Sequence, residues 1–351
     1  MRAAYLHGAE DIRIGEAPDN EPPGPGEVLL NVASVGICGS DLHSYLYGAV
    51  GEIAPQEPLI LGHEAAGVIG AIGPQVETAY RVGQLVAIDP SVPCGLCENC
   101  EHGNPHLCSY QHFLGLWPDH GAMREQMVYP ASACIALPDG ITPEAAALLE
   151  PLGVALHAIR LAKIQVGEDV LVTGCGAIGL LIIRLAHLAG ARRIFASDQH
   201  GWRLTMAQEF GATDPVQVGS DLAVKVVEVV QRTTLGRGVD VAIEAAWVAH
   251  TANECIEATR NGGRVVIVGI PVEETISFRS SPARRKGLTV KFSRRMNHTY
   301  PAAIALAASG QVPLDRLATH RFNLERSAEA FRYAATYVEG VHRVMVMPGS
   351  R

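Results

Sequence analysis

The stretch 170-VLVTGCGAIG-179 joins a short aliphatic run to three glycines, and the apolar segment Leu180–Leu188 follows it. The aliphatic run predicts a buried β-strand and the apolar segment a helix, so the glycines lie where a strand turns into a helix. In that context Gly174 forms the turn, Gly176 lets a pyrophosphate approach the backbone, and Gly179 allows close helix–strand packing. The free N–H groups of the helix N-terminus favour the phosphates. The stretch therefore predicts a dinucleotide site, and a glycine turn without a ligand is the alternative. The predicted cofactor-binding residues of this loop are Gly174, Gly176, Ala177, Ile178 and Gly179.

Around this stretch, from about residue 153 to residue 294, predicted strands alternate with predicted helices. The further strands are Arg193–Ser197, Val239–Ile243 and Arg264–Val268, and the further helices are Trp202–Phe210 and Asn253–Arg260. Such alternation predicts βαβ units and a doubly wound parallel sheet, which makes the fold class α/β.

The choice of dinucleotide depends on the residue that ends the second predicted strand. Asp198 stands there, 19 residues after Gly179. A carboxylate at this point accepts hydrogen bonds from the adenine-ribose diol and repels a 2′-phosphate, which favours NAD over NADP. Arg203 leaves the alternative open, because its guanidinium can pair with a phosphate or cover the adenine.

The first 150 residues follow a different pattern. Glycines and prolines separate short apolar runs such as Val28–Leu30 and Leu85–Ile88, which predicts a barrel-like β-rich domain. After about residue 295 a predicted helix (Pro301–Ser309) and the run Val344–Val346 remain. They are too little for a third domain, and we expect them to complete one of the other two.

Composition limits the class of protein. The chain has 351 residues, enough for about two domains, and a formal net charge of −8. An acidic balance disfavours nucleic acids and anionic membranes as partners. No apolar run reaches the roughly 18 residues that span a bilayer, and Met1–Gly8 lacks the apolar core of a signal peptide. We therefore expect a soluble, cytoplasmic protein.

Four of the eight cysteines fall within fifteen residues, and these are Cys94, Cys97, Cys100 and Cys108. Thiolates at this spacing can converge on one tetrahedral Zn²⁺, and four thiolates leave no open position. The spacing predicts a structural zinc lobe at about residues 90–110, with a redox pair as the alternative.

A second set of metal-binding residue types is spread along the chain. Cys38 lies outside the four-cysteine loop, His63 and Glu64 are adjacent, and Glu150 comes much later. A thiolate, an imidazole and a carboxylate would make a zinc site with room for substrate. Taken singly, a buried cysteine is the more ordinary interpretation of Cys38, and a core histidine that of His63.

The chain resembles the zinc-dependent medium-chain dehydrogenases over essentially its full length. The resemblance rests on Gly62–Val76 (GHEAAGVIGAIGPQV), Arg81–Gly83 (RVG), the four-cysteine loop and the glycine loop. Within that family it is most similar to the polyol (sorbitol/L-iditol) dehydrogenase-like branch, and the residues concerned are Cys38–His43 (CGSDLH), Glu150–Leu152 (EPL) and Thr319–Phe322 (THRF).

The resemblance implies a GroES-like β-barrel domain (1–152), a Rossmann NAD-binding domain (153–294) and a C-terminal segment (295–351) that returns to the barrel. It also implies a homotetramer with two Zn²⁺ per chain, one catalytic and one structural. Cys38 and His63 become ligands of the catalytic zinc, while Glu64 and Glu150 are both candidates for the third ligand. Cys175 lies in the nucleotide loop, so we do not assign it to zinc.

The expected reaction is oxidation of a secondary alcohol to the ketone by hydride transfer to NAD. Ser40 would take up the substrate proton and pass it through the nicotinamide ribose to His43 near the surface. A solvated or capping role is the alternative for His43.

The substrate is expected to be a sugar alcohol or a sugar acid. In the polyol branch an Arg-Tyr pair reaches the substrate hydroxyls, and here Arg294 is followed by Arg295 instead of tyrosine. A second guanidinium suits a carboxylate, although Arg295 can equally face solvent or a subunit contact. Tyr45, Phe113 and Trp117 would line the pocket or belong to the core. An L-threonine 3-dehydrogenase and a non-catalytic structural or binding relative are the alternative functions.

Overall fold

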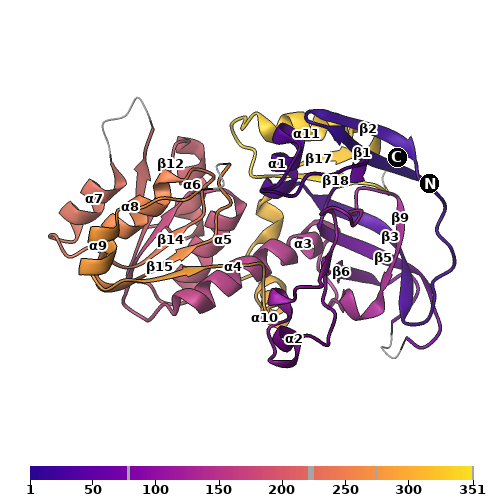
Figure 1. Cartoon of the computed structure of the whole chain (residues 1–351), viewed down its shortest axis with the longest axis horizontal. Helices are drawn as coiled ribbons and strands as arrows, with labels where there is room; N and C mark the ends of the chain where they lie inside the picture. The colour runs from indigo at the N-terminus through magenta and orange to yellow at the C-terminus, as the bar shows by residue number, and fades with distance from the viewer. Residues whose placement is uncertain (77–79, 220–224, 273–274, 350–351) are drawn as a thin grey trace. The chain divides into compact units, whose positions relative to one another are not determined.

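The computed structural model describes residues 1–76, 80–219, 225–272 and 275–349. These residues form two compact units (Figure 1). Unit 1 combines Met1–Glu150 with Tyr300–Arg351, and unit 2 is Pro151–Thr299. The domain boundaries expected from the sequence follow residues 152 and 294.

Unit 2 contains a six-stranded parallel sheet with the strand order β13-β12-β11-β14-β15-β16. Its strands are β11 (Asp169–Thr173), β12 (Arg193–Asp198), β13 (Asp214–Gln217), β14 (Val239–Glu244), β15 (Thr259–Ile267) and β16 (Thr289–Phe292). This order is that of a Rossmann fold, so the predicted doubly wound sheet is confirmed. The order reverses between β11 and β14, and ligands of such sheets bind at the carboxyl ends of the strands at that point.

Helices line this sheet (Figure 1), which explains the burial of its central strands. Every residue of β11 and of β14 is buried, as expected of strands covered on both faces. The helices are α4 (Leu149–Ala162), which begins in unit 1, α5 (Ala177–Leu188), α6 (Gly201–Phe210), α7 (Val226–Thr233), α8 (His250–Ala258) and α9 (Ser280–Arg285).

The structure differs from the sequence prediction at the end of α8. The predicted helix Asn253–Arg260 ends at Ala258, because Thr259 already begins β15 and pairs with Val239. The β-branched Thr259 and the run Asn261-Gly262-Gly263 two residues later are unfavourable in a helix and compatible with an irregular strand.

Unit 1 contains the predicted β-rich domain. Its largest sheet has the order β10-β6-β5-β3-β18-β17, with β9 also paired to β3, and smaller sheets are β2-β1-β4 and β7-β8. The strands are β1 (Arg2–Gly8), β2 (Asp11–Glu16), β3 (Glu27–Gly36), β4 (Leu59–Ile60), β5 (Glu64–Ile72), β6 (Leu85–Ile88), β7 (Ser91–Val92), β8 (His112–Phe113), β9 (Gln126–Pro130), β10 (Cys134–Ala136), β17 (Ala318–Asn323) and β18 (Arg343–Met347). Its core includes large buried side chains such as Leu30, Ile69 and Ile88.

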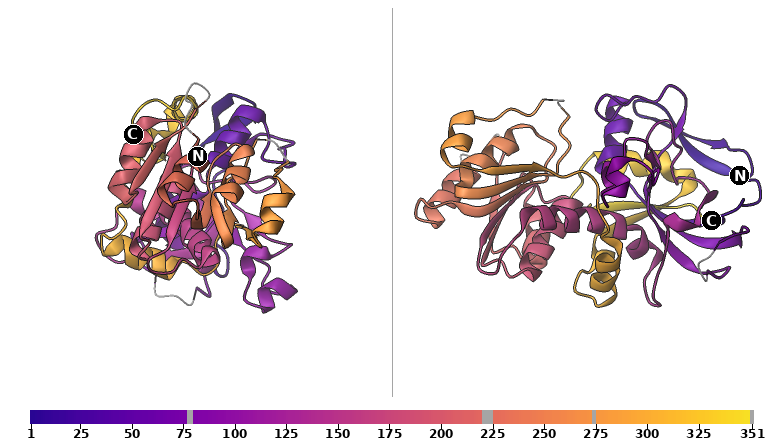
Figure 2. Two further views of the ribbon diagram at one scale, coloured as in Figure 1. Left: turned by 90° about the vertical axis from the view of Figure 1, so that its left-hand side faces the viewer. Right: turned by 60° about the horizontal axis from the view of Figure 1, so that its bottom comes forward.

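The C-terminal segment completes this domain, as the resemblance implies. Strand β18 pairs antiparallel with β3 and parallel with β17, so residues after 300 extend a sheet built from the first 136 residues (Figures 1 and 2). The helices of unit 1 are α1 (Gly39–Tyr47), α2 (Glu98–Glu101), α3 (Pro143–Ala147), α10 (Tyr300–Ala308) and α11 (Ser327–Ala335), with short 3₁₀ turns at Pro105–Leu107, Ala131–Ala133, Leu314–Arg316 and Leu324–Arg326.

None of the helices in the described ranges has the length and apolar character that a bilayer crossing requires.

Candidate metal centres and dinucleotide site

One short loop brings the four cysteines of the predicted lobe together. Their Sγ atoms all lie within 4.8 Å of one another. The Sγ atoms of Cys97 and Cys100 are 3.5 Å apart, as are those of Cys94 and Cys108. Two thiolates on one tetrahedral Zn²⁺, with Zn–S bonds of about 2.3 Å, lie about 3.8 Å apart, whereas a disulfide measures about 2.05 Å. All eight cysteines of the chain are free thiols.

Backbone N–H groups favour the thiolate form of cysteines in this loop. The N–H groups of Cys94 and Tyr110 each donate to Cys108 Sγ at 3.4 Å, and they lower the pKa of that thiol. The N–H of Cys100 lowers the pKa of Cys97 to about 6. Zinc binds thiolates, so the donor set and its hydrogen bonds fit a structural zinc.

Cys38, His63 and Glu64 form a second group whose ligand atoms lie within 4.8 Å of one another. Cys38 immediately precedes α1, and Glu64 begins β5. Glu64 is paired with Gly36 on β3, where a Cβ would lie 2.3 Å from Glu64 Oε2. A glycine at position 36 therefore leaves the room that the carboxylate occupies.

Asp41 holds this group in place, and the sequence analysis did not identify it as a site residue. It is 2% exposed. Its Oδ2 accepts the N–H of Cys38 at 2.9 Å and its Oδ1 accepts the N–H of Gly62 at 3.2 Å. Asp41 Oδ1 also lies 3.5 Å from His63 Nδ1. A carboxylate on Nδ1 fixes the imidazole and leaves Nε2 for a metal.

The electrostatics of the group favour a positive charge. Burial opposes a charge on His63, yet the Asp41 carboxylate and the Cys38 thiol raise the pKa of its imidazole well above the ordinary value. The same groups would stabilise a metal cation between them.

Arg343 is the second residue that the sequence analysis missed. It comes from β18, is 7% exposed, and its Nη2 lies 3.0 Å from Glu64 Oε1, while its Nη1 donates to the Ile37 carbonyl at 2.6 Å. Within the described chain, neither oxygen of Glu64 accepts a well-aligned hydrogen bond. A buried carboxylate with one ion pair and unused lone pairs fits a metal ligand.

Glu150 lies at the start of α4 and is not a member of this ligand group. It is buried, and burial raises the pKa of its carboxyl to about 8, with His63 opposing and Glu64 supporting the shift. A buried acid of this kind can hold or exchange a proton near neutral pH.

The two proposed relay residues have different environments. Ser40 Oγ lies 3.4 Å from His63 Nε2. The structure differs from the expectation that His43 lies near the surface, because it is 3% exposed and burial lowers the pKa of its imidazole. Residues Asp41–Tyr45 of α1 are all buried, so this helix does not present a solvated face at position 43.

The predicted substrate residues also lie in different environments. The Phe113 ring lies 5.4 Å from that of His63, whereas Tyr45 is buried against Phe331, in agreement with a core role. Trp117 is half-buried in unit 1. In unit 2, Arg294 is exposed, and Arg295 is half-buried with φ of 53°.

The glycine loop of unit 2 has the geometry that a dinucleotide site needs. Gly174 adopts φ of 84°, and a Cβ on Gly179 would lie 1.8 Å from the Gly174 carbonyl oxygen. Gly176 precedes α5 and has open space where a Cβ would stand. Ala177 and Ile178 form the first turn of α5, whose N–H groups are available to an anion.

Asp198 ends β12 beside this loop. Its Oδ2 accepts the Cys175 N–H at 2.8 Å and its Oδ1 accepts the His200 N–H at 2.9 Å. Arg203 Nη1 lies 3.6 Å from Asp198 Oδ2, and its guanidinium lies 5.1 Å from the centre of the Trp202 ring.

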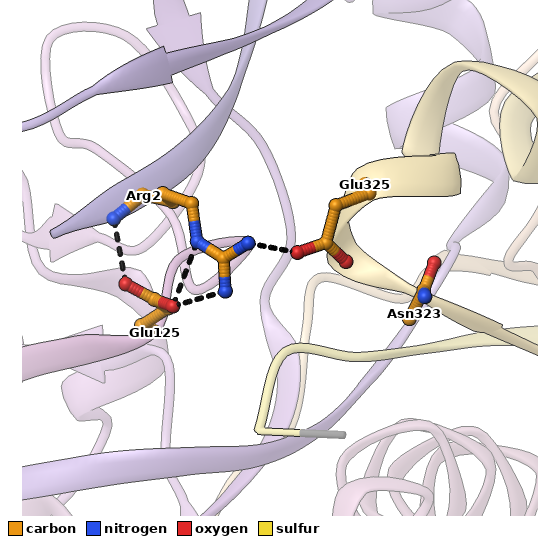
Figure 3. Close-up of a pocket in the computed structure, with 4 residues that line it drawn as sticks. All are labelled: Arg2, Glu125, Asn323 and Glu325. Atoms are coloured by element: carbon orange, nitrogen blue, oxygen red, sulfur yellow. Dashed lines mark hydrogen bonds and ion pairs between the residues drawn. The ribbon is translucent and has the colours of Figure 1, made fainter. Parts of the chain in front are cut away.

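A separate pocket of about 400 Å³ in unit 1 is lined by Arg2, Glu125, Asn323 and Glu325 (Figure 3). Arg2 points between the two carboxylates, with Nη2 2.6 Å from Glu125 Oε1 and Nη1 bonded to Glu325. The charged side chains that line this pocket pair with one another, so we assign no ligand to the pocket.

Comparison with known proteins places these sites in context. Residues 24–139 match the model of the alcohol dehydrogenase GroES-like domain, and residues 177–309 match that of the zinc-binding dehydrogenases. The chain is 35% identical over 348 residues to a sorbitol dehydrogenase of Bacillus subtilis, which covers 99% of this chain and 97% of the relative. It is also 35% identical over 347 residues to a probable D-xylulose reductase A of Emericella nidulans, covering 98% and 96%.

Among solved structures, the L-idonate 5-dehydrogenase of Escherichia coli superposes with a TM-score of 0.89 at 27% identity, and the match covers 99% of this chain and 97% of that one.

Proposed function

This chain belongs to the zinc-dependent medium-chain dehydrogenases, and from that premise we propose that it oxidises a secondary alcohol of a sugar alcohol or sugar acid to the ketone. The observation that carries the proposal is the meeting of Cys38, His63 and Glu64 in a chain that also has the glycine turn at Gly174. Similarity to a sorbitol dehydrogenase supports a polyol substrate, and similarity to an L-idonate 5-dehydrogenase supports a sugar acid.

Cys38, His63 and Glu64 are the proposed ligands of the catalytic zinc, and Cys94, Cys97, Cys100 and Cys108 those of the structural zinc. When bound at this group, a zinc ion would supply Lewis-acid chemistry at the substrate hydroxyl, and a bound NAD would supply the acceptor for the hydride. Asp41 keeps the His63 imidazole in one orientation, and Arg343 offsets the buried charge of Glu64. Glu150, outside the ligand group, is the proposed buried acid that exchanges a proton on the substrate side.

Ser40 is the proposed first acceptor of the substrate proton, because its hydroxyl lies 3.4 Å from His63 Nε2. His43, on the same helix α1, is the proposed next proton acceptor after Ser40. Since His43 is buried, a further step to solvent is required after it. Burial lowers the pKa of His43, so the imidazole is neutral and would hold an accepted proton only weakly.

NAD is the proposed cofactor in preference to NADP, because the Asp198 carboxylate stands at the end of β12 where a 2′-phosphate would be repelled. The nearby Arg203 pairs with that carboxylate, which supports a role in covering the adenine. Arg294 and Arg295 are the proposed contacts to the polar groups of the substrate, with Phe113 and Trp117 as candidate pocket walls.

The test is NAD⁺ reduction, followed at the nicotinamide absorbance, with a panel of sugar alcohols, aldonates and L-threonine, with and without a chelator. We expect chelator-sensitive reduction with a polyol or an aldonate. Reduction with L-threonine alone would replace the proposed substrate class, and no reduction with any substrate would contradict the proposed function. NADP⁺ in parallel tests the cofactor preference.

The family resemblance further supports a homotetramer, and light scattering of the purified protein tests the oligomeric state.

A further inference from the structure

Glu244 is a buried carboxylate for which the mechanism above has no use. It is the last residue of β14, it pairs with Thr173 of β11, and it is 3% exposed. It therefore lies at the point where the strand order reverses, at the carboxyl ends of the strands, which is where ligands of this fold bind. Thr173 is followed directly by Gly174, the first glycine of the dinucleotide loop.

The carboxylate does not point to solvent but binds the segments around it. Oε1 accepts the N–H of Ala246 at 2.7 Å and is 2.8 Å from Thr251 Oγ1 on α8. Oε2 accepts the N–H of Gly269, after β15, at 3.2 Å. One side chain thus connects the segment after β14, the first turn of α8 and the segment after β15.

The segment after β14 lies directly against the glycine turn. A Cβ on Gly174 would stand 2.6 Å from the Ala245 carbonyl oxygen and 3.1 Å from the Ala246 Cα. A Cβ on Gly269 would stand 2.0 Å from the Ala246 carbonyl oxygen. With so little space, a shift of Ala245–Ala246 toward either glycine would displace the Gly174 turn or the backbone at Gly269.

We propose that Glu244 is a positioning residue of the dinucleotide site, which holds Ala245–Ala246 against the glycine turn and couples it to the segment at Gly269. This inference rests on the proposed function, because it assumes that NAD binds at the glycine loop. The cofactor binds well only when the carboxylate is ionised and accepts the Ala246 N–H.

The hydroxyl of Thr251 gives the protonated form an alternative arrangement. Thr251 Oγ1 lies 2.6 Å from the Val248 carbonyl oxygen as well as 2.8 Å from Glu244 Oε1, and its single proton serves one of them. A protonated Glu244 can donate to Thr251 Oγ1, which then donates to Val248. In that state the acceptor for the Ala246 N–H is weakened, so the contact to the glycine turn loosens.

The surroundings allow this change near neutral pH. Burial raises the pKa of Glu244 to about 7, while the bonds from Ala246, Thr251 and Gly269 act in the opposite direction. From α8 the titratable group that faces it is Cys255, whose thiol pKa is raised by burial and by Glu244, so it stays neutral. The residues that face it from β11 and after β15, Thr173 and Gly269, do not titrate.

The experiment measures NADH binding to the intact holoenzyme by calorimetry between pH 6 and 9, for wild type and Glu244→Gln. The amide keeps one acceptor oxygen but presents an NH₂ group in place of the second, so it imitates the protonated state. We expect the wild-type Kd to rise on the order of tenfold as the pH falls through about 7, and the variant to show the weaker Kd at every pH.

A second readout separates positioning from a general loss of structure. If binding requires the ionised carboxylate, NADH must displace a proton from Glu244. Binding near pH 7, compared in buffers of different ionisation enthalpy, should release about half a proton in wild type and none from this group in Glu244→Gln. The matched control is Glu254→Gln on α8, which should bind NADH and release protons as wild type does.

Four outcomes overturn the inference. One is an unchanged Kd and unchanged proton release in Glu244→Gln. Another is a lower Tm of that variant with the NADH affinity unaltered. If Glu244→Gln does not fold, Thr251→Val is tested instead. This substitution removes one hydrogen-bond donor to the carboxylate and should raise the midpoint pH of NADH binding. An unchanged midpoint pH is the third outcome that overturns the inference. Wild type that binds NADH with a flat pH profile overturns Glu244 alone, whereas wild type that binds no NADH overturns the proposed function as well.

Discussion

The two candidate metal groups of unit 1 are assembled in different ways. The four cysteines lie within one loop of fifteen residues, and that loop itself supplies the N–H groups that favour their thiolates. The Cys38–His63–Glu64 group is drawn from separate elements and is supported by Asp41 from α1 and by Arg343 from β18. The first group can form from local chain alone, whereas the second requires the completed sheet. We therefore expect them to differ in what their loss does to activity and stability.

The largest expected effect is that of His63→Ala. The value of kcat/KM should fall by at least about 10³-fold, because a catalytic metal contributes several kcal/mol of transition-state stabilisation. The NADH Kd and the circular dichroism spectrum should be unchanged, since the glycine loop belongs to unit 2. His7→Ala, at an exposed position, is the control. If His63→Ala fails to fold, the second group is structural, like the first.

On treatment with a chelator, the Cys38–His63–Glu64 group should lose its zinc before the four-cysteine loop does. Three protein ligands leave a position through which a chelator can enter, whereas four thiolates leave none. Activity should therefore disappear with about one zinc equivalent while the Tm changes little, and added zinc should restore it. Metal analysis, rates and melting curves on the same samples check this order. Simultaneous loss of both zincs and of stability would remove the distinction.

Asp41→Asn tests a difference between the two groups. The Cys38–His63–Glu64 group is held by a supporting carboxylate, whereas the four-cysteine loop has no such residue in our description of it. The amide can still accept the N–H of Cys38 but loses the charge beside His63 Nδ1. Removing such a partner of a ligand histidine typically costs 10–100-fold in metal affinity or activity. Zinc titration and kcat/KM should both move by about that factor, and Asp139→Asn, on the exposed surface, should move neither. An unchanged zinc affinity would show that Asp41 acts only on the fold.

The smallest expected effect on catalysis is that of Cys97→Ser. The variant should lose one zinc equivalent and melt roughly 5–10 °C lower, because a structural zinc contributes to folding directly. Its kcat/KM per folded molecule should stay within about threefold of wild type. Leu96→Ser, whose side chain is 83% exposed in the same loop, is the control. A variant that keeps its Tm and its second zinc contradicts the structural assignment.

The same contrast explains how much of the site was predictable from sequence. Sequence spacing alone identifies the four cysteines and the three glycines, because the function of each motif depends on residues close together in the chain. The cysteines are Cys94, Cys97, Cys100 and Cys108. Glu64 and Glu150 could not be ordered from the sequence, since only the pairing of β5 with β3 places the Glu64 carboxylate in the ligand group.

Two supporting residues were missed for different reasons. Asp41 could have been identified from the sequence. It lies three positions after Cys38, the N-cap residue of α1, and an acidic residue at that position often accepts the N–H of the N-cap residue. Arg343 carried none, since its partners Glu64 and Ile37 lie hundreds of residues earlier in the chain. The parallel sheet of unit 2 was predicted from strand–helix alternation and its Rossmann character from the family resemblance, while the short edge strands β13 and β16 gave too little periodicity to detect.

The insertion of β18 between β3 and β17 has a consequence for how the protein is made. During synthesis the N-terminal part of a chain leaves the ribosome first, and domains fold largely as they emerge. Unit 2 is continuous and can fold as soon as residue 299 is exposed, but unit 1 must wait for β18. Until Arg343 arrives, Glu64 lacks the one ion-pair partner that it has among the described residues, so the nascent chain acquires its nucleotide fold before the proposed catalytic metal group.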